Sequence, residues 1–171
     1  MFEHMTACCF TGHRPADLPG GGNEASPDMI GLKLLLFHTV EDAIAAGVTD
    51  FYAGGAKGFD TIAAEAVLSC KQLHPQVHLH LALPAKTQAD SWAVADKARY
   101  QTILSCADSV FYASEADLTT ASMHRRNRYL VDHADCCIAY LAKQTGGTWY
   151  TLQYAMQHDI PLVNLALHIY A

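Results

Sequence analysis

The first apolar run of the chain ends in a loop whose residue types can bind an anion. Thr11-Gly12-His13-Arg14-Pro15 supplies a small hydroxyl, a glycine and a cation directly after that run. Turn chemistry explains the glycine and the proline, but it does not explain a histidine beside an arginine. We therefore predict that Thr11, Gly12, His13 and Arg14 contribute to a site for a negatively charged group.

Two further loops are rich in glycine and join a strand-like run to a helix. They read AGGAKGFD, residues 53–60, and AKQTGGTWYT, residues 142–151. Glycine lets the backbone approach a ligand closely, and a helix N-terminus offers unpaired N–H groups to a phosphate. Either loop alone is explained equally well as a simple turn, but two such loops beside the cationic loop favour a phosphate-containing ligand. The ligand-binding residues predicted here are Gly54, Gly55, Ala56, Gly58, Asp60, Gly146, Gly147 and Thr148.

Two common nucleotide motifs are absent from these loops. The P-loop pattern GxxxxGK[ST] does not occur, because the spacing from Gly54 to Lys57 is too short. Neither loop has the GxGxxG fingerprint of dinucleotide-binding domains. The sequence therefore lacks the motifs that ATP hydrolysis and ordinary hydride transfer require, and no cofactor is predicted.

The segment MHRRNRYLVDHAD carries three arginines on a predicted helix. At helical spacing Arg125 and Arg128 share one side with Asp132, while Arg126 points elsewhere. One interpretation is a solvated face with an Arg128–Asp132 pair. The other, which we favour because of the loops around it, is that Arg126 or Asn127 reaches the bound phosphate.

The elements that must position these loops alternate between strand-like and helix-like runs. Several apolar runs are continuous, as in parallel strands that are buried on both faces. Strands are expected at Ala7–Phe10, Asp50–Tyr52, Val77–Leu83, Ser109–Tyr112, Cys136–Leu141 and Pro161–Leu165. About five β-α repeats predict a Rossmann-like, doubly wound and mainly parallel α/β sheet with helices on both faces, in three layers. We expect residues 1–171 to form a single domain.

Helix signals fill the gaps between these runs. Ser26-Pro27-Asp28 predicts a helix start, and Gly47 marks its end. A second helix begins at Phe59 and places apolar residues as far as Leu73 on one side. Further helices are expected over 91–105, over 122–133 and from about residue 148, the last with Leu152, Ala155 and Met156 on its buried side.

Composition and charge narrow the function classes. No apolar run approaches the ~20 residues of a membrane span, and the N-terminus lacks a basic region before its apolar run, so a cytoplasmic protein without membrane contacts is expected. The net charge of −6 argues against a nucleic acid as partner, because such binding needs a cationic surface.

The cysteines form no CxxC pair and lie mostly in apolar runs. His78 and His80 alternate along one strand without a third ligand nearby, so no metal site is predicted.

The order of these motifs resembles the YpsA-like family. The residues that carry the resemblance are Thr11-Gly12-His13-Arg14-Pro15, the loop from Gly54 to Asp60, Arg126-Asn127-Arg128-Tyr129 with Asp132 and Asp135, and Gly146-Gly147-Thr148, together with the stretch WAVADKARYQTILSCADSV. That family belongs to the superfamily that joins the DNA-processing protein DprA to the LOG cytokinin-activating enzymes. The resemblance implies a Rossmann-like domain and a nucleotide or NAD-derived ligand, such as ADP-ribose.

The resemblance leaves two functions open. LOG enzymes cleave a nucleoside monophosphate with the help of a glutamate that follows a PGGxGTxxE loop, and Leu152 occupies that position here. We therefore favour a binding or sensor domain, in which the glycine loops and the arginines hold phosphate and Asp60 accepts hydrogen bonds from a ribose. The alternative is a LOG-like nucleotide N-glycosidase with another carboxylate, from Asp60, Glu65 or Asp132. A third possibility is a scaffold for protein contacts, and Trp149 and Tyr150 can serve a homo-oligomer interface.

Overall fold

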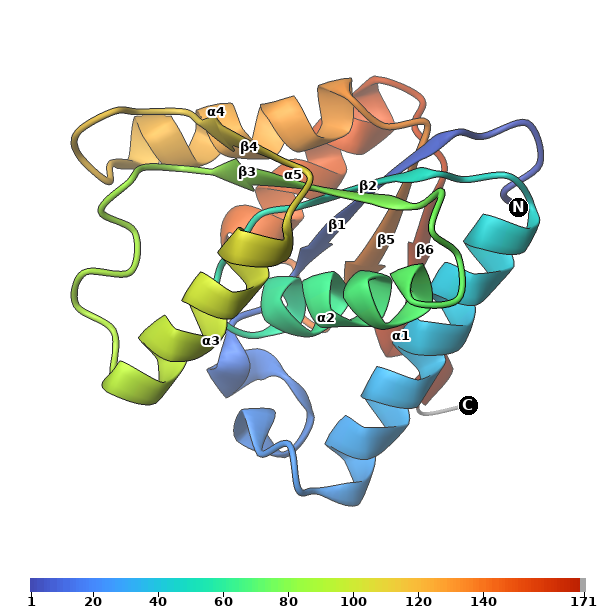
Figure 1. The fold of residues 1–171 in the computed structure, drawn as a ribbon, viewed down its shortest axis with the longest axis horizontal. Helices are drawn as coiled ribbons and strands as arrows, with labels where there is room; N and C mark the ends of the chain where they lie inside the picture. Colours follow the sequence, from blue (N-terminus) through green and yellow to red (C-terminus); the bar gives the residue numbers. More distant parts are fainter. Residues whose placement is uncertain (170–171) are drawn as a thin grey trace.

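Six parallel strands form one sheet in the computed structural model, which describes residues 1–169 (Figure 1). Their order across the sheet is β4-β3-β2-β1-β5-β6. All neighbouring strands pair in parallel. The predicted Rossmann-like α/β class is confirmed. The strands are β1 (Ala7–Gly12), β2 (Asp50–Ala53), β3 (His78–Leu83), β4 (Ser109–Tyr112), β5 (Cys136–Tyr140) and β6 (Leu162–Asn164).

Helices cover both faces of this sheet, which gives three layers (Figure 1). One face carries α1 (Pro27–Ala45), α2 (Phe59–Lys71) and α3 (Val94–Cys106). The other face carries α4 (Thr120–Asp132) and α5 (Gly146–Gln157), and a short α6 (Ala166–Ile169) follows the last strand. None of the helices within residues 1–169 combines the length and the apolar character of a membrane span.

The direction in which the chain adds strands changes at β1. β2, β3 and β4 are added on one side of β1, and the chain then returns to place β5 and β6 on the other side. In open α/β sheets, ligands bind beyond the carboxyl ends of the strands at such a switch point. A ligand site is therefore expected at the loops after β1 and β5.

The ends of the helices follow local chemistry, with some differences from the sequence-based expectation. Ser26 caps α1 by accepting a hydrogen bond from the N–H of Met29, and Gly47 adopts a φ of 114° just after that helix. α5 begins at Gly146, two residues earlier than expected, so both loop glycines belong to its first turn. Met156 was expected to be buried and is 48% exposed.

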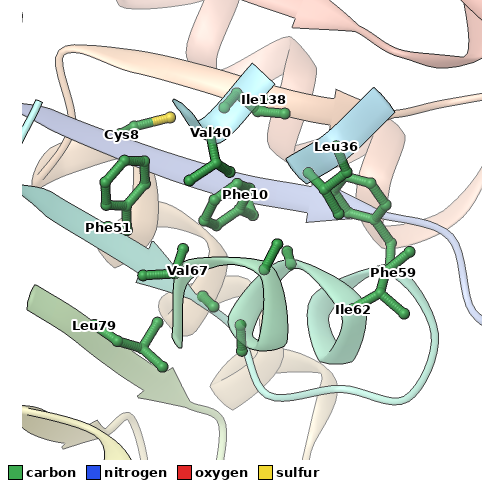
Figure 2. Packing of buried hydrophobic residues seen from close by; sticks show 14 of the residues in the cluster. Cys8, Phe10, Leu36, Val40, Phe51, Phe59, Ile62, Val67, Leu79 and Ile138 are labelled. Atoms are coloured by element: carbon green, nitrogen blue, oxygen red, sulfur yellow. The ribbon is translucent and has the colours of Figure 1, made fainter. Parts of the chain in front are cut away.

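The main hydrophobic core fills the space between the sheet and the helices α1–α3. The rings of Phe10 in β1 and Phe51 in β2 stack at 5.9 Å. Side chains of α1 and α2, among them Leu36 and Val67, pack around them (Figure 2). Leu73 lies beyond the end of α2 and is exposed, so the predicted apolar side of that helix ends at Cys70.

A second core lies under α4 and α5. It includes Cys9, Cys137 and Leu152. The Cys-Cys doublets of β1 and β5 are neighbours in the sheet, with Cys8 opposite Cys136 and Cys9 opposite Cys137. All four are buried free thiols. These cysteines fill the interior as small apolar side chains.

Candidate functional site

A cavity of about 510 Å³ opens at the switch point, between the loops after β1 and β5 and one side of α4. We call it the switch-point cavity. Its volume lies in the range of small-molecule sites, roughly 300–1,000 Å³. It brings together eleven of the fourteen predicted site residues, namely Thr11, Gly12, His13, Arg14, Ala56, Asp60, Arg126, Asn127, Gly146, Gly147 and Thr148.

The other three predicted residues do not line this cavity. Gly54, Gly55 and Gly58 are glycines for reasons of packing within the protein. A Cβ on Gly54 would lie 2.5 Å from Nη1 of Arg126, and one on Gly58 would lie 2.6 Å from the carbonyl oxygen of His13. Gly55 and Gly58 also have positive φ, 70° and 94°. The glycine-rich loop after β2 thus makes room for buried protein groups, and Gly55 and Gly58 line a different, neighbouring cavity.

Some lining residues were not predicted from the sequence. Thr120, Met123 and His124 lie on the side of α4 that faces the cavity, one helical turn apart and in line with Asn127. The signal was present as the spacing i, i+3, i+4, i+7. The three arginines of the same segment carry a stronger signal for a phosphate ligand and obscure this spacing.

Arg126 and Asp60 place opposite charges in the buried wall of the cavity. Arg126 is 5% exposed and Asp60 is 7% exposed. The guanidinium donates to the carbonyl oxygen of Gly54 and to Oδ1 of Asn127, and the N–H of Ala56 donates to Oδ2 of Asp60 at 3.2 Å. Arg126 and Asn127 both reach the cavity. This is the position that they need if either is to contact a bound phosphate, as we favoured from the sequence.

Burial and neighbouring charge act in opposite directions on this pair. Burial raises the pKa of Asp60, whereas Arg126 and Arg14 lower it. Burial likewise lowers the pKa of Arg126, and Asp60 opposes that shift. Each charged form is costly by itself in such a place. The two residues therefore depend on each other to remain ionised, while Arg14 favours the charged form of Asp60 and disfavours that of Arg126.

His13 connects the loops on the two sides of the switch point. Its Nε2 accepts hydrogen bonds from the backbone N–H groups of Ala142 and Lys143, at 3.0 and 3.1 Å. Its carbonyl oxygen accepts from the N–H of Phe59 at the start of α2. Burial lowers the pKa of His13, which favours the neutral ring that these contacts require. His13 therefore positions the loops, in addition to lining the cavity.

The first turn of α5 presents backbone donors to the cavity. The first N–H groups of a helix have no partner inside it, and here Gly146, Gly147 and Thr148 lie in that turn and line the cavity. The N-cap residue Thr145 makes no side-chain capping bond. A Cβ on Gly147 would meet only Nδ2 of Asn127, at 3.7 Å. The open space over Gly147 is suited to an anion.

The remaining arginines have different surroundings. Arg14 is exposed, and no hydrogen bond or ion pair ties its guanidinium to another residue within 1–169. Arg128 donates to the hydroxyl of Tyr150, while Asp132 accepts from Tyr154. The expected Arg128–Asp132 pair is therefore not formed. Arg125 donates to the carbonyl oxygen of Ala113, away from the cavity.

The carboxylates of the site decide what chemistry it can support. Leu152, at the position of the LOG glutamate, is 2% exposed and packs in the second core. Glu65 is paired with Arg99 outside the cavity. The lining contains Asp60 and Asp17, and Asp17 is paired with Lys143. Asp60 is thus the carboxylate that remains for a ligand.

Metal-ligating residues show no suitable cluster. Within residues 1–169, no group of three or more His, Cys, Asp or Glu side chains has the arrangement of a metal site. His80 contacts Oδ1 of Asp50 at 2.7 Å and Oγ of Ser109 at 2.6 Å. Hydrogen bonds to neighbouring strands therefore account for this histidine.

Two solved structures share the fold. DNA processing protein A from Helicobacter pylori superposes with a TM-score of 0.63 at 19% identity, over 92% of this chain and 63% of that one. DprA from Streptococcus pneumoniae gives 0.62 at 18% identity, over 92% of this chain and 49% of that one. This chain therefore spans less than two thirds of either protein, and at this identity the likeness shows the fold.

These structures correct one sequence-based prediction. The Helicobacter pylori protein binds single-stranded DNA, so our prediction against a nucleic acid as partner is wrong. Net charge is a property of the whole surface, whereas a binding site depends on the local field. Arg14 and Arg126 lie together in the switch-point cavity of a chain whose net charge is −6.

Sequence relatives identify the family. YoqJ of Bacillus subtilis, an uncharacterized prophage-derived protein, is 30% identical over 142 residues, which are 76% of this chain and 83% of YoqJ. A UPF0398 protein of Halalkalibacterium halodurans is 32% identical over 118 residues, 68% of this chain and 62% of the relative. The family model YpsA, described as the YspA SLOG family, matches residues 8–164. The chain therefore belongs to the YpsA family of SLOG proteins, as the resemblance of its motifs predicted.

Proposed function

We propose that the chain is a nucleotide-binding domain whose ligand places a phosphate over the first turn of α5. The observation that carries this proposal is one cavity that combines the unpaired N–H groups of Gly146–Thr148 with the unpaired cation Arg14. Backbone donors and a positive helix end favour negative charge. A nearby guanidinium adds charge-assisted hydrogen bonds.

Asp60 supports a ribose beside that phosphate. Its Oδ2 accepts from the N–H of Ala56, while its Oδ1 accepts no hydrogen bond from the residues that the structure describes. A carboxylate with a free oxygen accepts from hydroxyl groups. A nucleotide offers both groups, a phosphate and the ribose hydroxyls. The cavity volume of about 510 Å³ also leaves room for an NAD-derived ligand such as ADP-ribose.

Binding without turnover is the function we favour for residues 1–171 as a single domain. Leu152 supplies no carboxylate where LOG enzymes have their glutamate. A specific observation keeps an N-glycosidase as the second candidate: Asp60 is a buried cavity carboxyl whose pKa is raised. Such groups serve as acids or bases in glycoside chemistry.

A cytoplasmic location is part of the proposal. The paired positions Cys8/Cys136 and Cys9/Cys137 lie in neighbouring strands and carry free thiols. Reducing compartments keep thiols in this state.

A thermal-shift screen tests the proposed ligand class. The probes are AMP, ADP-ribose, NAD, a single-stranded oligodeoxynucleotide and inorganic phosphate, with adenosine as the control that lacks a phosphate. A ligand at a hundred times its Kd adds about 2.7 kcal/mol of stability. Stabilisation by a phosphorylated nucleoside but not by adenosine supports the proposal. No stabilisation by any probe contradicts it.

Product analysis separates the two candidate functions. Each stabilising probe is incubated with the protein, and free base and nicotinamide are measured by chromatography. A sensor leaves the probe intact. Release of base that is lost in Asp60→Asn would establish the N-glycosidase.

A further inference from the structure

A second cavity, of about 340 Å³, lies on the opposite side of the loop after β1. We call it the α2–α3 cavity, because those helices form two of its walls and the segment from Pro15 to Met29 forms another. Apolar side chains from five different parts of the chain line it, among them Leu18, Met29, Ile62, Leu81, Trp92 and Ile103. Asp60 is the residue of the proposed nucleotide site that also lines this space.

Backbone contacts separate the two cavities. The N–H of Phe59 donates to the carbonyl oxygen of His13 at 3.1 Å. A Cβ on Gly58 would lie within 2.9 Å of backbone atoms of Arg14 and Pro15. The loop after β1 is therefore pressed against the start of α2. A ligand in one cavity cannot extend into the other through this contact.

The interior of the α2–α3 cavity is suited to a flat ring. Trp92 and Tyr100 meet edge to face, with ring centroids 5.2 Å apart, and both line the space. Aromatic side chains pack well against further rings in stacked or edge-on geometry. Ile62 and Ile103 are buried on the facing helices. These side chains offer apolar contact to the faces of a ring, while charged residues such as Lys57 and Asp96 lie elsewhere in the lining.

Asp60 supplies the polar contact, because it lines both cavities. It is buried, and its Oδ1 accepts no hydrogen bond within the described residues. A carboxylate oxygen has two lone pairs, so Oδ1 can accept one hydrogen bond from each side. A ligand of the α2–α3 cavity should therefore carry an N–H group that points at Asp60.

The cations around the α2–α3 cavity are already neutralised. Arg99 forms two hydrogen bonds with Glu65 and two with Glu24, at 2.5 to 2.9 Å. Lys57 lies 3.8 Å from Asp96 and 5.6 Å from the centroid of Trp92. An anion would have to displace one of these partners. The α2–α3 cavity thus differs from the switch-point cavity, where Arg14 is unpaired.

We propose that the α2–α3 cavity is a second small-molecule site, for a neutral planar aromatic compound that donates an N–H to Asp60. The apolar walls and the two aromatic rings bind the flat faces of the compound. The paired charges at the mouth select against anions. The two proposed sites share Asp60, but the contact between His13 and Phe59 separates the two ligands.

The chain has two tryptophans, one inside the α2–α3 cavity and one outside it. Trp92 lines the α2–α3 cavity, and Trp149 lies in α5 and packs on the second core. Trp149→Phe leaves Trp92 as the single reporter, and Trp92→Phe leaves Trp149. The probe is adenine, which is neutral, planar and has N–H donors. The control probes are 9-methylpurine, which lacks them, and orotate, which is an anion.

Titration of the Trp149→Phe protein with adenine should give a saturable change in fluorescence, and orotate should give none. 9-Methylpurine should bind about tenfold more weakly, since it makes no hydrogen bond to Asp60. Ala64→Leu adds carbon atoms to the wall of the cavity and should abolish the change, while unfolding measurements show that the chain still folds. Asp60→Asn keeps the shape and should weaken adenine binding about tenfold. Asp42→Asn, which changes an exposed carboxylate of α1 outside both cavities, is the matched control and should bind like the parent.

Three results would overturn the proposal. Adenine could leave Trp92 fluorescence unchanged, it could act only on Trp149 in the Trp92→Phe protein, or it could bind the Ala64→Leu protein as well as the parent. The Gly147→Ala variant shows whether a negative result concerns the α2–α3 cavity or the proposed nucleotide site. That change alters the switch-point cavity alone, so adenine binding reported by Trp92 should persist in it.

Discussion

Gly147→Ala gives the most direct test of whether the first turn of α5 holds phosphate. Gly147 does not have a positive φ, and a Cβ there would make an ordinary contact of 3.7 Å with Asn127. Alanine is preferred over glycine in a helix by about 0.5–1 kcal/mol. The variant without ligand should therefore be as stable as the parent or up to about 1 kcal/mol more stable, a gain of roughly 2–4 °C in Tm.

The same methyl group should remove most of the stabilisation by a nucleotide. It projects into the space over the helix end, where it holds a phosphate away from the N–H groups. Loss of one charge-assisted hydrogen bond costs about 2 kcal/mol, or roughly thirtyfold in affinity. At a ligand concentration of a hundred parental Kd, the stabilisation should fall from about 2.7 to about 0.9 kcal/mol.

Calorimetric unfolding with and without the best nucleotide separates these two effects. Gly31→Ala is the matched control, because Gly31 lies in α1 with no atom near its Cβ position. It should gain stability in the same way and keep the full response to the ligand. If Gly147→Ala keeps the full response as well, the phosphate does not lie over α5 and the reasoning is refuted.

Three further changes test other parts of the site. Arg14→Ala should leave the unfolding free energy unchanged, since Arg14 is exposed and unpaired within residues 1–169. It should weaken nucleotide binding by about 1.5–3 kcal/mol in isothermal calorimetry, and an affinity equal to that of the parent would remove Arg14 from the site. The pKa of His13 is lowered by burial, so the unfolded chain takes up the proton first and stability falls as the pH drops below the ordinary value of 6.5. Denaturant unfolding of His13→Gln should show a smaller loss over that range, and an unchanged pH profile would contradict the assignment. The pKa of Glu24 is lowered to about 2 by Arg99, so its contribution is complete above the ordinary value of 4.5 and is lost as the pH falls towards 2. Glu24→Gln should therefore be less stable than the parent at neutral pH, and the difference should shrink in acid; a difference that does not depend on pH would show that the ion pair is not its source.

The fold was accessible from the sequence because its signals are local. Continuous apolar runs identify buried parallel strands, and Ser26 and Gly47 mark the ends of α1 as local chemistry requires. Met156 was misplaced for a reason that lies outside the helix. The helical period of 3.6 residues places Met156 near the buried side of α5. The neighbouring elements do not cover that side of the helix at Met156, and its side chain is 48% exposed.

The site was harder to predict, because several of its glycines serve the protein and not a ligand. From the sequence, Gly54 and Gly58 look like Gly147. In the structure, the first two make room for Arg126 and for the backbone at His13, while Gly147 faces open space. That distinction depends on contacts between residues far apart in the chain. A glycine in the sequence shows where another group comes close to the backbone. It does not show whether that group belongs to the protein or to a ligand.

The buried pair of Asp60 and Arg126 connects these observations. Burying charged groups costs free energy of folding, so stability alone is a weak reason to keep both charges here. Gly54 has no side chain, which allows both charges to approach it, and Asn127 orients the guanidinium. Asp60 then lies in the walls of both cavities with one oxygen unused. A carboxylate at this position can contact a ligand on either side, which agrees with the binding function that we propose.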